Sequence, residues 1–391
     1  MKALCWNGVN DLVVEQVKDP RILNPQDAIV KVTLSSVCGS DLHLLNGYVP
    51  GMRKGDIIGH EFTGEVLETG AEVRNLKKGD RVVVGSVIGC GECHYCSQDS
   101  WSLCDNSNPH AWLQEKVYGY ATAGIFGYSH TFGGYAGSHA QFIRVPFADR
   151  GAFKIPEELS DEQVLFVSDA FPTGYMAADM AGIKGGDIVA VWGCGGVGQM
   201  AIRSAWLLGA ERVIAIDRLR DRLEMAKTHG RAEVLNYEET DILEALKEMT
   251  GGRGPDCCID AVGMEAHTTG IEHYYDRIKQ TLRLETDRPA VLRQAIMACR
   301  KGGTLSVVGV YAGLVDKFPM GVVMNKALTI RSGQMHAQKY IPQLIELVKK
   351  AEVDPSYLLT HSCALENGPE SYQMFKHKTD NCMRAVFRPN D

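Results

Sequence analysis

Short apolar runs broken by glycine and proline fill the first third of the chain. The stretches DAIVKVTLSSV, EFTGEVLETG and DRVVVGSVIG are rich in β-branched residues and end at turn-forming residues. This pattern predicts antiparallel strands in a compact, barrel-like lobe.

The pattern changes after Lys184, where short apolar runs alternate with helical stretches such as VGQMAIRSAWLLGA. The strand candidates are DIVAVWG, RVIAID, AEVLNY, DCCIDAVG, TLSVVGVY and ALTIRSG. Six strands joined by helical crossovers predict a doubly wound parallel sheet, so the predicted fold class is α/β. The segment from YIPQLIELVKKAEV onward leaves this alternation, and we expect it to pack back on the first lobe.

One segment is too long for an ordinary strand-to-helix loop. HTTGIEHYYDRIKQTLRLETDR, residues 267–288, is rich in charged and aromatic residues. It is either a functional lid or a surface insertion. Its position favours a lid, because parallel sheets bind ligands at the carboxyl ends of their strands.

Composition narrows the class of partner. The 391 residues are 45% hydrophobic and 23% charged, which is typical of a globular protein of about two or three domains. A net charge of -7 without a basic stripe argues against nucleic acid as a partner. No secretion signal or stretch of about 20 apolar residues is present, so we expect a cytoplasmic protein that does not interact with membranes.

Four of the twelve cysteines form the pattern C-x2-C-x2-C-x7-C through Cys90, Cys93, Cys96 and Cys104. Clustered cysteines in a reducing compartment are first considered as metal ligands. Four thiolates close a tetrahedral zinc site, which therefore stabilises a loop without performing chemistry. An iron-sulfur cluster is the other metal that this spacing allows.

A glycine-rich turn follows the first predicted parallel strand. In WGCGGVGQM, the G-x-G-x-x-G pattern is formed by Gly193, Gly195 and Gly198. Such a turn lets a pyrophosphate approach the backbone at the start of the next helix. Asp217, at the end of the next strand, favours NAD, since a carboxylate there binds ribose hydroxyls and repels a 2'-phosphate. Arg218 could pair with a 2'-phosphate, so NADP stays an alternative cofactor. Arg222 lies one helical turn further on and could reach the same ribose.

A second set of candidate metal ligands comes from two separate stretches of the chain. VCGSDLH contains Cys38, Ser40, Asp41 and His43, and GHEFTGEVLETGAEV contains His60 and Glu61 after its first residue, Gly59. A thiolate and an imidazole from separate loops are natural zinc ligands, and a third ligand with one open position would complete a catalytic site.

The second stretch satisfies the signature G-H-E-x2-G-x5-G-x2-V, from Gly59 to Val73. With CGSDLH, the four cysteines and the glycine turn in the same order, the chain resembles the medium-chain zinc-dependent alcohol dehydrogenases over nearly its full length. SDAFPTGYMAA, the strand ending at Asp217 and the insertion after Gly263 look most like the formaldehyde dehydrogenase-like branch, which includes glutathione-independent formaldehyde dehydrogenases and dismutases.

The resemblance implies roles for particular residues. It implies that the catalytic zinc ligands are Cys38, His60 and Asp169, with Glu61 able to approach the metal. It implies a proton relay through Ser40 and His43 and a structural zinc on the four cysteines. Arg222 would lie beside the adenosine ribose, and Arg384 would contact the pyrophosphate. The expected dinucleotide contacts are Gly193, Gly195, Gly196, Val197, Gly198, Asp217, Arg218, Arg222, Val262, Gly263, Gly309, Val310 and Arg384.

The resemblance also implies a division into domains. Residues 1–168 and 333–391 are expected to form a GroES-like catalytic domain, with the structural zinc lobe at about 88–106. Residues 169–332 are expected to form a Rossmann NAD-binding domain that carries the insertion.

The implied function is a zinc- and NAD-dependent oxidoreductase, with two zinc ions per chain, that acts on a primary alcohol or a small aldehyde, formaldehyde included. The alternatives are a dismutase that retains NAD, a polyol or secondary-alcohol dehydrogenase, and a non-catalytic dinucleotide-binding protein. We expect a homo-oligomer, a dimer or tetramer, with KALTIRSG as a candidate edge strand.

The loop between Cys104 and Gln141 is rich in aromatic residues and histidines. Trp112, Tyr118 and Phe126 are candidates either to line a substrate pocket or to cover the zinc lobe. Loop histidines are usually solvated, so surface positions are expected for His110, His130 and His139, although the sequence leaves the contacts of His139 open.

Overall fold

Residues 1–264, 289–311 and 313–391 are described by the computed structural model, and they fall into two units. The first unit consists of Met1–Pro172 and Met335–Asp391, and the second is Thr173–Gln334. The predicted lid at residues 267–288 lies outside the described residues.

The first unit is built around a largely antiparallel sheet with the strand order β15-β16-β3-β5-β6-β8, in which β7 also pairs with β3. Alternate residues such as Val30, Val32, Phe62 and Val82 form its core. A smaller sheet has the order β2-β1-β4. The strands are β1 (Lys2–Gly8), β2 (Asp11–Gln16), β3 (Ala28–Ser36), β4 (Asp56–Ile57), β5 (Glu61–Thr69), β6 (Arg81–Val84), β7 (Phe142–Val145), β8 (Ala152–Lys154), β15 (His361–Cys363) and β16 (Ala385–Phe387).

The C-terminal segment returns to this first sheet, as expected. Val386 and Phe387 of β16 pair antiparallel with Ser36 and Ser35 of β3. The helices of the unit are α1 (Asp41–Leu45), α2 (Ala111–Tyr118), α3 (Ala148–Gly151), α4 (Asp161–Val164), α12 (Ala337–Lys349) and α13 (Gly368–His377), with short 3-10 turns η1 (Cys96–Gln98), η2 (Trp101–Leu103), η3 (His130–Phe132), η4 (Leu165–Ser168), η5 (Pro355–Leu358) and η6 (Leu365–Asn367).

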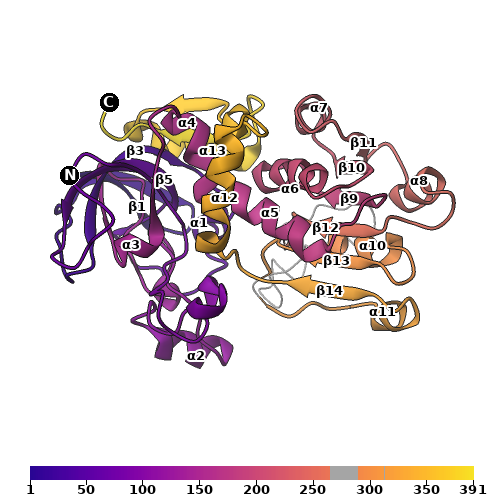
Figure 1. Cartoon of the computed structure of the whole chain (residues 1–391), viewed down its shortest axis with the longest axis horizontal. Helices are drawn as coiled ribbons and strands as arrows, with labels where there is room; N and C mark the ends of the chain where they lie inside the picture. Colours follow the sequence, from indigo (N-terminus) through magenta and orange to yellow (C-terminus); the bar gives the residue numbers. More distant parts are fainter. Residues whose placement is uncertain (265–288, 312) are drawn as a thin grey trace. The chain divides into compact units, whose positions relative to one another are not determined.

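The second unit contains the predicted doubly wound sheet. All neighbouring pairs are parallel, in the order β11-β10-β9-β12-β13-β14 (Figure 1). Its strands are β9 (Ile188–Trp192), β10 (Arg212–Asp217), β11 (Glu233–Asn236), β12 (Cys257–Asp260), β13 (Thr304–Val307) and β14 (Thr329–Ser332).

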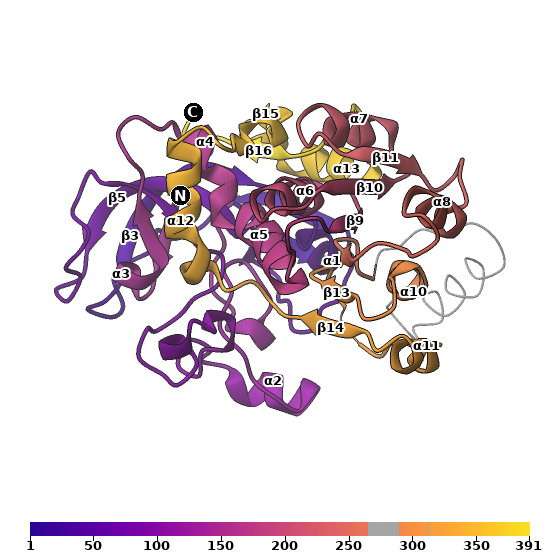
Figure 2. The same ribbon diagram turned by 45° about the vertical axis from the view of Figure 1, so that its right-hand side comes forward.

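Helices cover both faces of this parallel sheet (Figure 2). Val189 and Val191 of β9 pack with α5, α6 and α7 on one face, whereas Ala190 and Trp192 pack with α8, α10 and α11 on the other. A strand buried on both faces reads as a continuous apolar run, which is why the sequence predicts it. The helices are α5 (Ala170–Ala181), α6 (Gly196–Leu207), α7 (Arg220–Thr228), α8 (Ile242–Met249), α10 (Ala290–Ala298) and α11 (Met320–Asn325).

Within the described ranges, none of the helices combines the length and apolar character that crossing a membrane requires.

Candidate active site

Cys38, His60 and Asp169 meet within the first unit although they come from distant parts of the chain. Cys38 follows β3, His60 precedes β5, and Asp169 lies between η4 and α5. One ligand atom from each lies within 4.8 Å of the others. Asp169 Oδ2 is 3.6 Å from Cys38 Sγ and 3.1 Å from His60 Nε2. A thiolate, an imidazole and a carboxylate around one point are a donor set that suits zinc.

Asp41 supports this cluster; the sequence pattern contained it, but no role was predicted for it. Its Oδ1 lies 3.0 Å from His60 Nδ1, and its Oδ2 accepts a hydrogen bond of 2.8 Å from the backbone N–H of Cys38. One carboxylate therefore orients both the imidazole and the loop that carries the thiol. The signal was a carboxylate three residues after Cys38 in a turn that leads into α1, where aspartate commonly binds backbone N–H groups.

The electrostatics of the cluster favour a cation. Burial opposes a charge on His60, but the charge of Asp41 and hydrogen bonds to Asp169 and Asp41 raise the pKa of His60 well above its ordinary value. Cys38 and His60 are buried, at 6% and 2% exposure. The carboxylates around the buried imidazole of His60 thus stabilise a positive charge at this point. A metal ion can take the place of that proton, so the residues fit a zinc ion.

Glu61 lies directly behind the ligands and is completely buried. Burial raises the pKa of Glu61 to about 7, against the opposing charge of Arg384. The backbone N–H of Ala170 donates to Oε1 at 3.0 Å, and Arg384 Nη1 lies 3.4 Å from Oε2. Glu61 thereby connects the residue after Asp169 to Arg384.

Arg384 is buried at the edge of the same cluster. Its Nη1 donates a hydrogen bond of 2.6 Å to the carbonyl of Val37, next to Cys38. The structure therefore places Arg384 against the ligand loops, and its predicted contact with a pyrophosphate stays a prediction.

Ser40 and His43 lie at the start of α1. Ser40 Oγ is 3.2 Å from His60 Nε2, so it faces the ligand cluster. His43, one turn further along, is buried. The predicted proton relay through these two residues stays a prediction.

Tyr128 lines the cluster and was also missed by the sequence analysis. Its ring packs edge-on against His60 with 5.6 Å between ring centroids. Burial raises the pKa of Tyr128 above its ordinary value, so the phenol stays neutral beside Ser40. Of the aromatic candidates, Phe126 packs on Phe62 in the sheet core, and Trp112 is 63% exposed. A loop has no periodic pattern from which these outcomes could be predicted.

The four cysteines Cys90, Cys93, Cys96 and Cys104 form the other group of potential ligands among the described residues, with their sulfur atoms within 4.8 Å of one another. Backbone N–H groups point at the sulfurs: those of Glu92 and Cys93 donate to Cys90 Sγ at 3.4 Å, and that of Cys90 donates to Cys104 Sγ at 3.3 Å. Such bonds favour thiolates, and the local 3-10 turns η1 and η2 hold the loop in this arrangement.

Without a bound cation, the four thiols of this group do not all ionise together. Burial raises the pKa of Cys96 and of Cys104. Burial also raises the pKa of Cys93, but hydrogen bonds, first among them those from the backbone N–H groups of Cys96 and Asp105, outweigh it and lower the pKa to about 7. A group that requires four thiolates therefore needs a bound cation, and the residues fit a tetrahedral zinc.

The glycine turn of the second unit has the geometry that the sequence predicts. Gly193 has φ +89°, and a Cβ on Gly198 would lie 1.7 Å from the carbonyl oxygen of Gly193. Gly195 precedes α6, and its nearest potential Cβ contact is Arg222 Nη1 at 3.6 Å. Gly196 and Val197 form the first turn of α6, whose N-terminal N–H groups suit a phosphate.

Asp217 ends β10 beside this turn. Its Oδ2 accepts a hydrogen bond of 2.7 Å from the N–H of Cys194, and its Oδ1 accepts from the N–H groups of Arg218 and Leu219 at 2.7 and 3.1 Å. Arg218 lies 3.6 Å from Glu238, and Arg222 is in the first turn of α7. The carboxylate thus fixes the glycine turn itself.

The remaining predicted cofactor contacts are brought together by Asp260, a residue that the sequence analysis missed. Its Oδ1 accepts from the N–H groups of Val262 and Gly263, and its backbone oxygen accepts from that of Gly309. The N–H of Met264 donates to the carbonyl of Val310 at 2.8 Å. Two loops at the carboxyl ends of β12 and β13 are therefore locked side by side.

His139 is not the surface group that loop position predicts, because its side chain is fully buried. His110 and His130 are half-buried. The surface prediction is wrong for His139 because its backbone is hydrogen-bonded to the N-terminal part of the unit. Its N–H donates to the carbonyl of Ile58, and its carbonyl accepts from the N–H of Leu4.

A barrel-like sheet with a buried metal-ligand cluster, in a chain that also carries a doubly wound dinucleotide sheet, defines an alcohol dehydrogenase fold. Residues 24–157 match the alcohol dehydrogenase GroES-like domain, and residues 196–277 match the zinc-binding dehydrogenase family.

The chain is 41% identical over 392 residues to AdhB of Bacillus subtilis (strain 168), a zinc-type alcohol dehydrogenase-like protein, with 100% of both chains covered. It is 31% identical to the glutathione-independent formaldehyde dehydrogenase of the same organism, over 96% of this chain and 94% of that protein. The structure of the alcohol dehydrogenase TADH from Thermus sp. ATN1 is similar with a TM-score of 0.83 at 32% identity, over 99% of each chain. The chain therefore belongs to the zinc-type medium-chain alcohol dehydrogenase family.

Proposed function

We propose that this protein is a zinc- and NAD-dependent dehydrogenase of primary alcohols that also reduces the corresponding small aldehydes. The convergence of Cys38, His60 and Asp169 on one buried point carries the proposal. A protein that only bound a dinucleotide would have no need of this cluster, which argues against the non-catalytic alternative.

In the proposed reaction, Cys38, His60 and Asp169 hold the catalytic zinc. When bound, zinc acts as a Lewis acid that favours loss of the proton from an alcohol hydroxyl. Ser40, 3.2 Å from His60 Nε2, accepts that proton through a hydrogen bond, and His43 passes it onward. The ring of Tyr128 packs against His60 on one side of the ligands and would shield the reacting group from water there, with its hydroxyl beside Ser40.

Glu61 and Arg384 hold the ligand loops together from behind, and the four cysteines hold a structural zinc in the lobe at about 88–106. The second unit is proposed as the cofactor domain and the first as the catalytic domain. NAD supplies the hydride acceptor. Its pyrophosphate would bind at the N-terminus of α6, and its adenosine ribose at Asp217 and Arg222.

Formaldehyde is a candidate substrate because one relative is a formaldehyde dehydrogenase, and Asp169 matches the ligand of that branch. If NAD stays bound through turnover, the enzyme would instead dismutate aldehydes. A polyol or secondary-alcohol dehydrogenase is the other alternative within the family.

One experiment separates these functions. Purified protein is assayed for NAD reduction with a panel of primary, secondary and polyhydric alcohols, and nucleotide released by denaturation is identified by mass. Reduction of added NAD with primary alcohols supports the proposal. Stoichiometric bound NAD with aldehyde dismutation and no use of added NAD would support the dismutase, and preference for secondary alcohols or polyols would overturn the proposed substrate class.

A homo-oligomer is proposed from the edge of the parallel sheet. β14 is an edge strand, all four of its residues are exposed, and Met320 and Met324 of the neighbouring α11 are also exposed. An exposed sheet edge with unpaired backbone groups, next to exposed methionines, favours pairing with another chain. Among the described residues the twelve cysteines form no disulfide, which favours a reducing compartment, so a cytoplasmic location is proposed with it.

A further inference from the structure

A row of buried polar side chains extends from Asp41 away from the metal-ligand cluster, through Tyr372 to His139 and Ser35. All are completely buried within the first unit. His139 Nε2 is 3.0 Å from the hydroxyl of Tyr372, and His139 Nδ1 is 2.7 Å from Ser35 Oγ. Ser35 Oγ is in turn 2.7 Å from Ser138 Oγ. Buried polar groups are costly unless bonded, so a network of this length needs an explanation.

Tyr372 connects this network to Asp41. Burial and the charge of Asp41 raise the pKa of Tyr372, which places the phenol beside that carboxylate. Where the phenol donates its one proton to Asp41, its oxygen accepts the hydrogen bond from His139 Nε2. In that arrangement Nδ1 of His139 carries no proton and Ser35 donates to it, so the hydrogen bonds run toward Asp41.

His139 also supports the ligand loop from its other side. The carbonyl of Ile58 accepts the N–H of His139 at 3.0 Å, and the carbonyl of Gly59 accepts that of Ser138 at 2.8 Å. A Cβ on Gly59 would lie 2.4 Å from His139 Nδ1, so the imidazole fills the space beside the residue that precedes His60. One buried ring thus contacts the backbone before His60 and, through Tyr372, the carboxylate that orients its imidazole.

We propose that Tyr372 and His139 are positioning residues that hold Asp41 and the loop of His60 in the geometry that binds the catalytic zinc. Neither residue touches the ligand atoms. This inference rests on the proposed function, because it concerns the metal site on which that function depends.

The test compares Tyr372→Phe with the wild-type enzyme. The substitution keeps the ring stacked on Phe387 and removes only the hydroxyl. Zinc release from the holoenzyme to a competing chelator is followed with a metal-sensitive dye, and Cys38→Ser identifies which phase of release belongs to the catalytic site. Outer-sphere partners of metal ligands typically change affinity about 10- to 100-fold. We expect Tyr372→Phe to weaken the catalytic zinc at least about tenfold and to leave the structural zinc unchanged.

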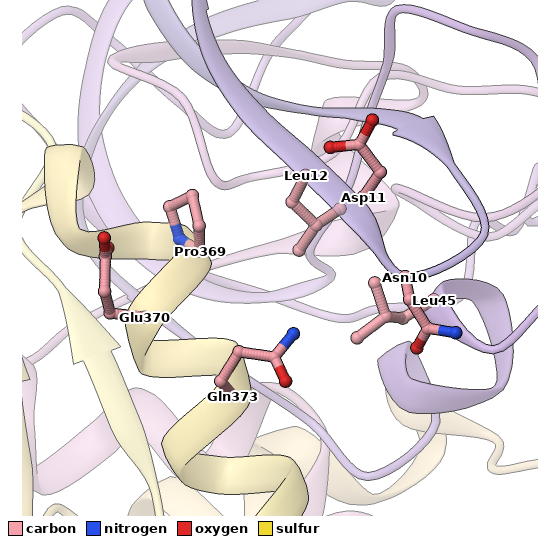
Figure 3. A pocket seen from close by; sticks show the side chains of 7 residues that line it. All are labelled: Asn10, Asp11, Leu12, Leu45, Pro369, Glu370 and Gln373. Carbon is pink, nitrogen blue, oxygen red and sulfur yellow. The ribbon is translucent and has the colours of Figure 1, made fainter.

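Two control variants separate positioning from general disturbance. Gln373→Ala changes the next residue of α13, whose side chain faces a surface pocket of about 260 Å³ beside Glu370 (Figure 3). Tyr135→Phe removes a tyrosine hydroxyl that bonds the carbonyl of Ser107 at 2.7 Å elsewhere in the unit. Both controls should retain wild-type affinity for the catalytic zinc.

A second pair of variants tests His139 by conservative rescue. His139→Leu removes both ring nitrogens, whereas His139→Gln keeps one donor and one acceptor. We expect His139→Leu to weaken the catalytic zinc and His139→Gln to restore much of its affinity.

Unchanged catalytic zinc in Tyr372→Phe, or an equal loss in Gln373→Ala or Tyr135→Phe, would overturn the inference while leaving the proposed function intact. A wild-type enzyme with zinc only at the four cysteines would overturn the metal site itself, and the inference with it.

Discussion

Asp217 performs two tasks with one carboxylate, since it fixes the glycine turn and is proposed to bind the adenosine ribose. We expect Asp217→Asn to raise the KM for NAD about tenfold, because a charged hydrogen-bond acceptor is lost, and to increase activity with NADP. Steady-state kinetics with both cofactors measure this. Glu224→Gln removes the same charge from an exposed position of α7 and should leave both KM values unchanged. An Asp217→Asn enzyme with wild-type cofactor preference would contradict the assignment.

His139 gives the first unit a defined sensitivity to acid. Burial lowers the pKa of His139 from its ordinary value of 6.5 to about 4. Between pH 6.5 and about pH 4, His139 binds a proton in the unfolded chain but not in the folded chain. The stability present above pH 6.5 is therefore lost as the pH falls. The free energy of unfolding should fall by about 3 kcal/mol more in the wild type than in His139→Gln between pH 7 and pH 4.

Urea unfolding at a series of pH values measures this difference, and a constant gap between the two proteins across that range would contradict it.

At the scale of elements, we predict that the loop at about 88–106 depends on the proposed structural zinc for its stability. Zinc contributes about 10 kcal/mol or more to the folding of small thiolate sites. We expect Cys96→Ser to lose the structural zinc and to make this loop susceptible to proteolysis. Metal analysis and limited proteolysis followed by mass spectrometry measure both effects.

Cys363→Ser is the matched control, because Cys363 lies in β15 and belongs to neither ligand group. It should keep two zinc ions and resist cleavage. Full zinc content and an intact loop in Cys96→Ser would show that the four cysteines do not form the proposed site.

The two types of sheet were predictable from the sequence for different physical reasons. β9, β10, β12 and β13 are covered on both faces and read as short apolar runs, whereas Val30, Val32 and their neighbours alternate in β3. The ligand candidates were predictable because their spacing matches a known motif. The contacts of Tyr372 were not, since Tyr372 and His139 are 233 residues apart and neither belongs to a motif. Phe126 and Tyr128 differ in role because of loop packing that has no sequence period.

At the scale of the whole molecule, the edge strand β14 gives the proposed oligomer a specific test. Ile330 is 37% exposed on that strand. We expect Ile330→Lys to convert the oligomer into a smaller species, because a lysine on an edge strand, in place of its one apolar side chain, opposes pairing. Light scattering after size-exclusion chromatography measures the mass.

Val9→Lys places the same charge at an exposed aliphatic position of the first unit and should leave the mass unchanged. A wild-type monomer, or an Ile330→Lys protein of wild-type mass, would contradict the proposed role of β14.

The account as a whole depends on a catalytic metal at Cys38, His60 and Asp169. The most direct test is the zinc content per chain, measured together with NAD-linked oxidation of a primary alcohol, for the wild type and for Cys38→Ser. We expect two zinc ions and activity in the wild type, and one zinc ion with activity lost at least about 1,000-fold in a folded Cys38→Ser protein. Two zinc ions with undiminished activity in Cys38→Ser would contradict the central claim.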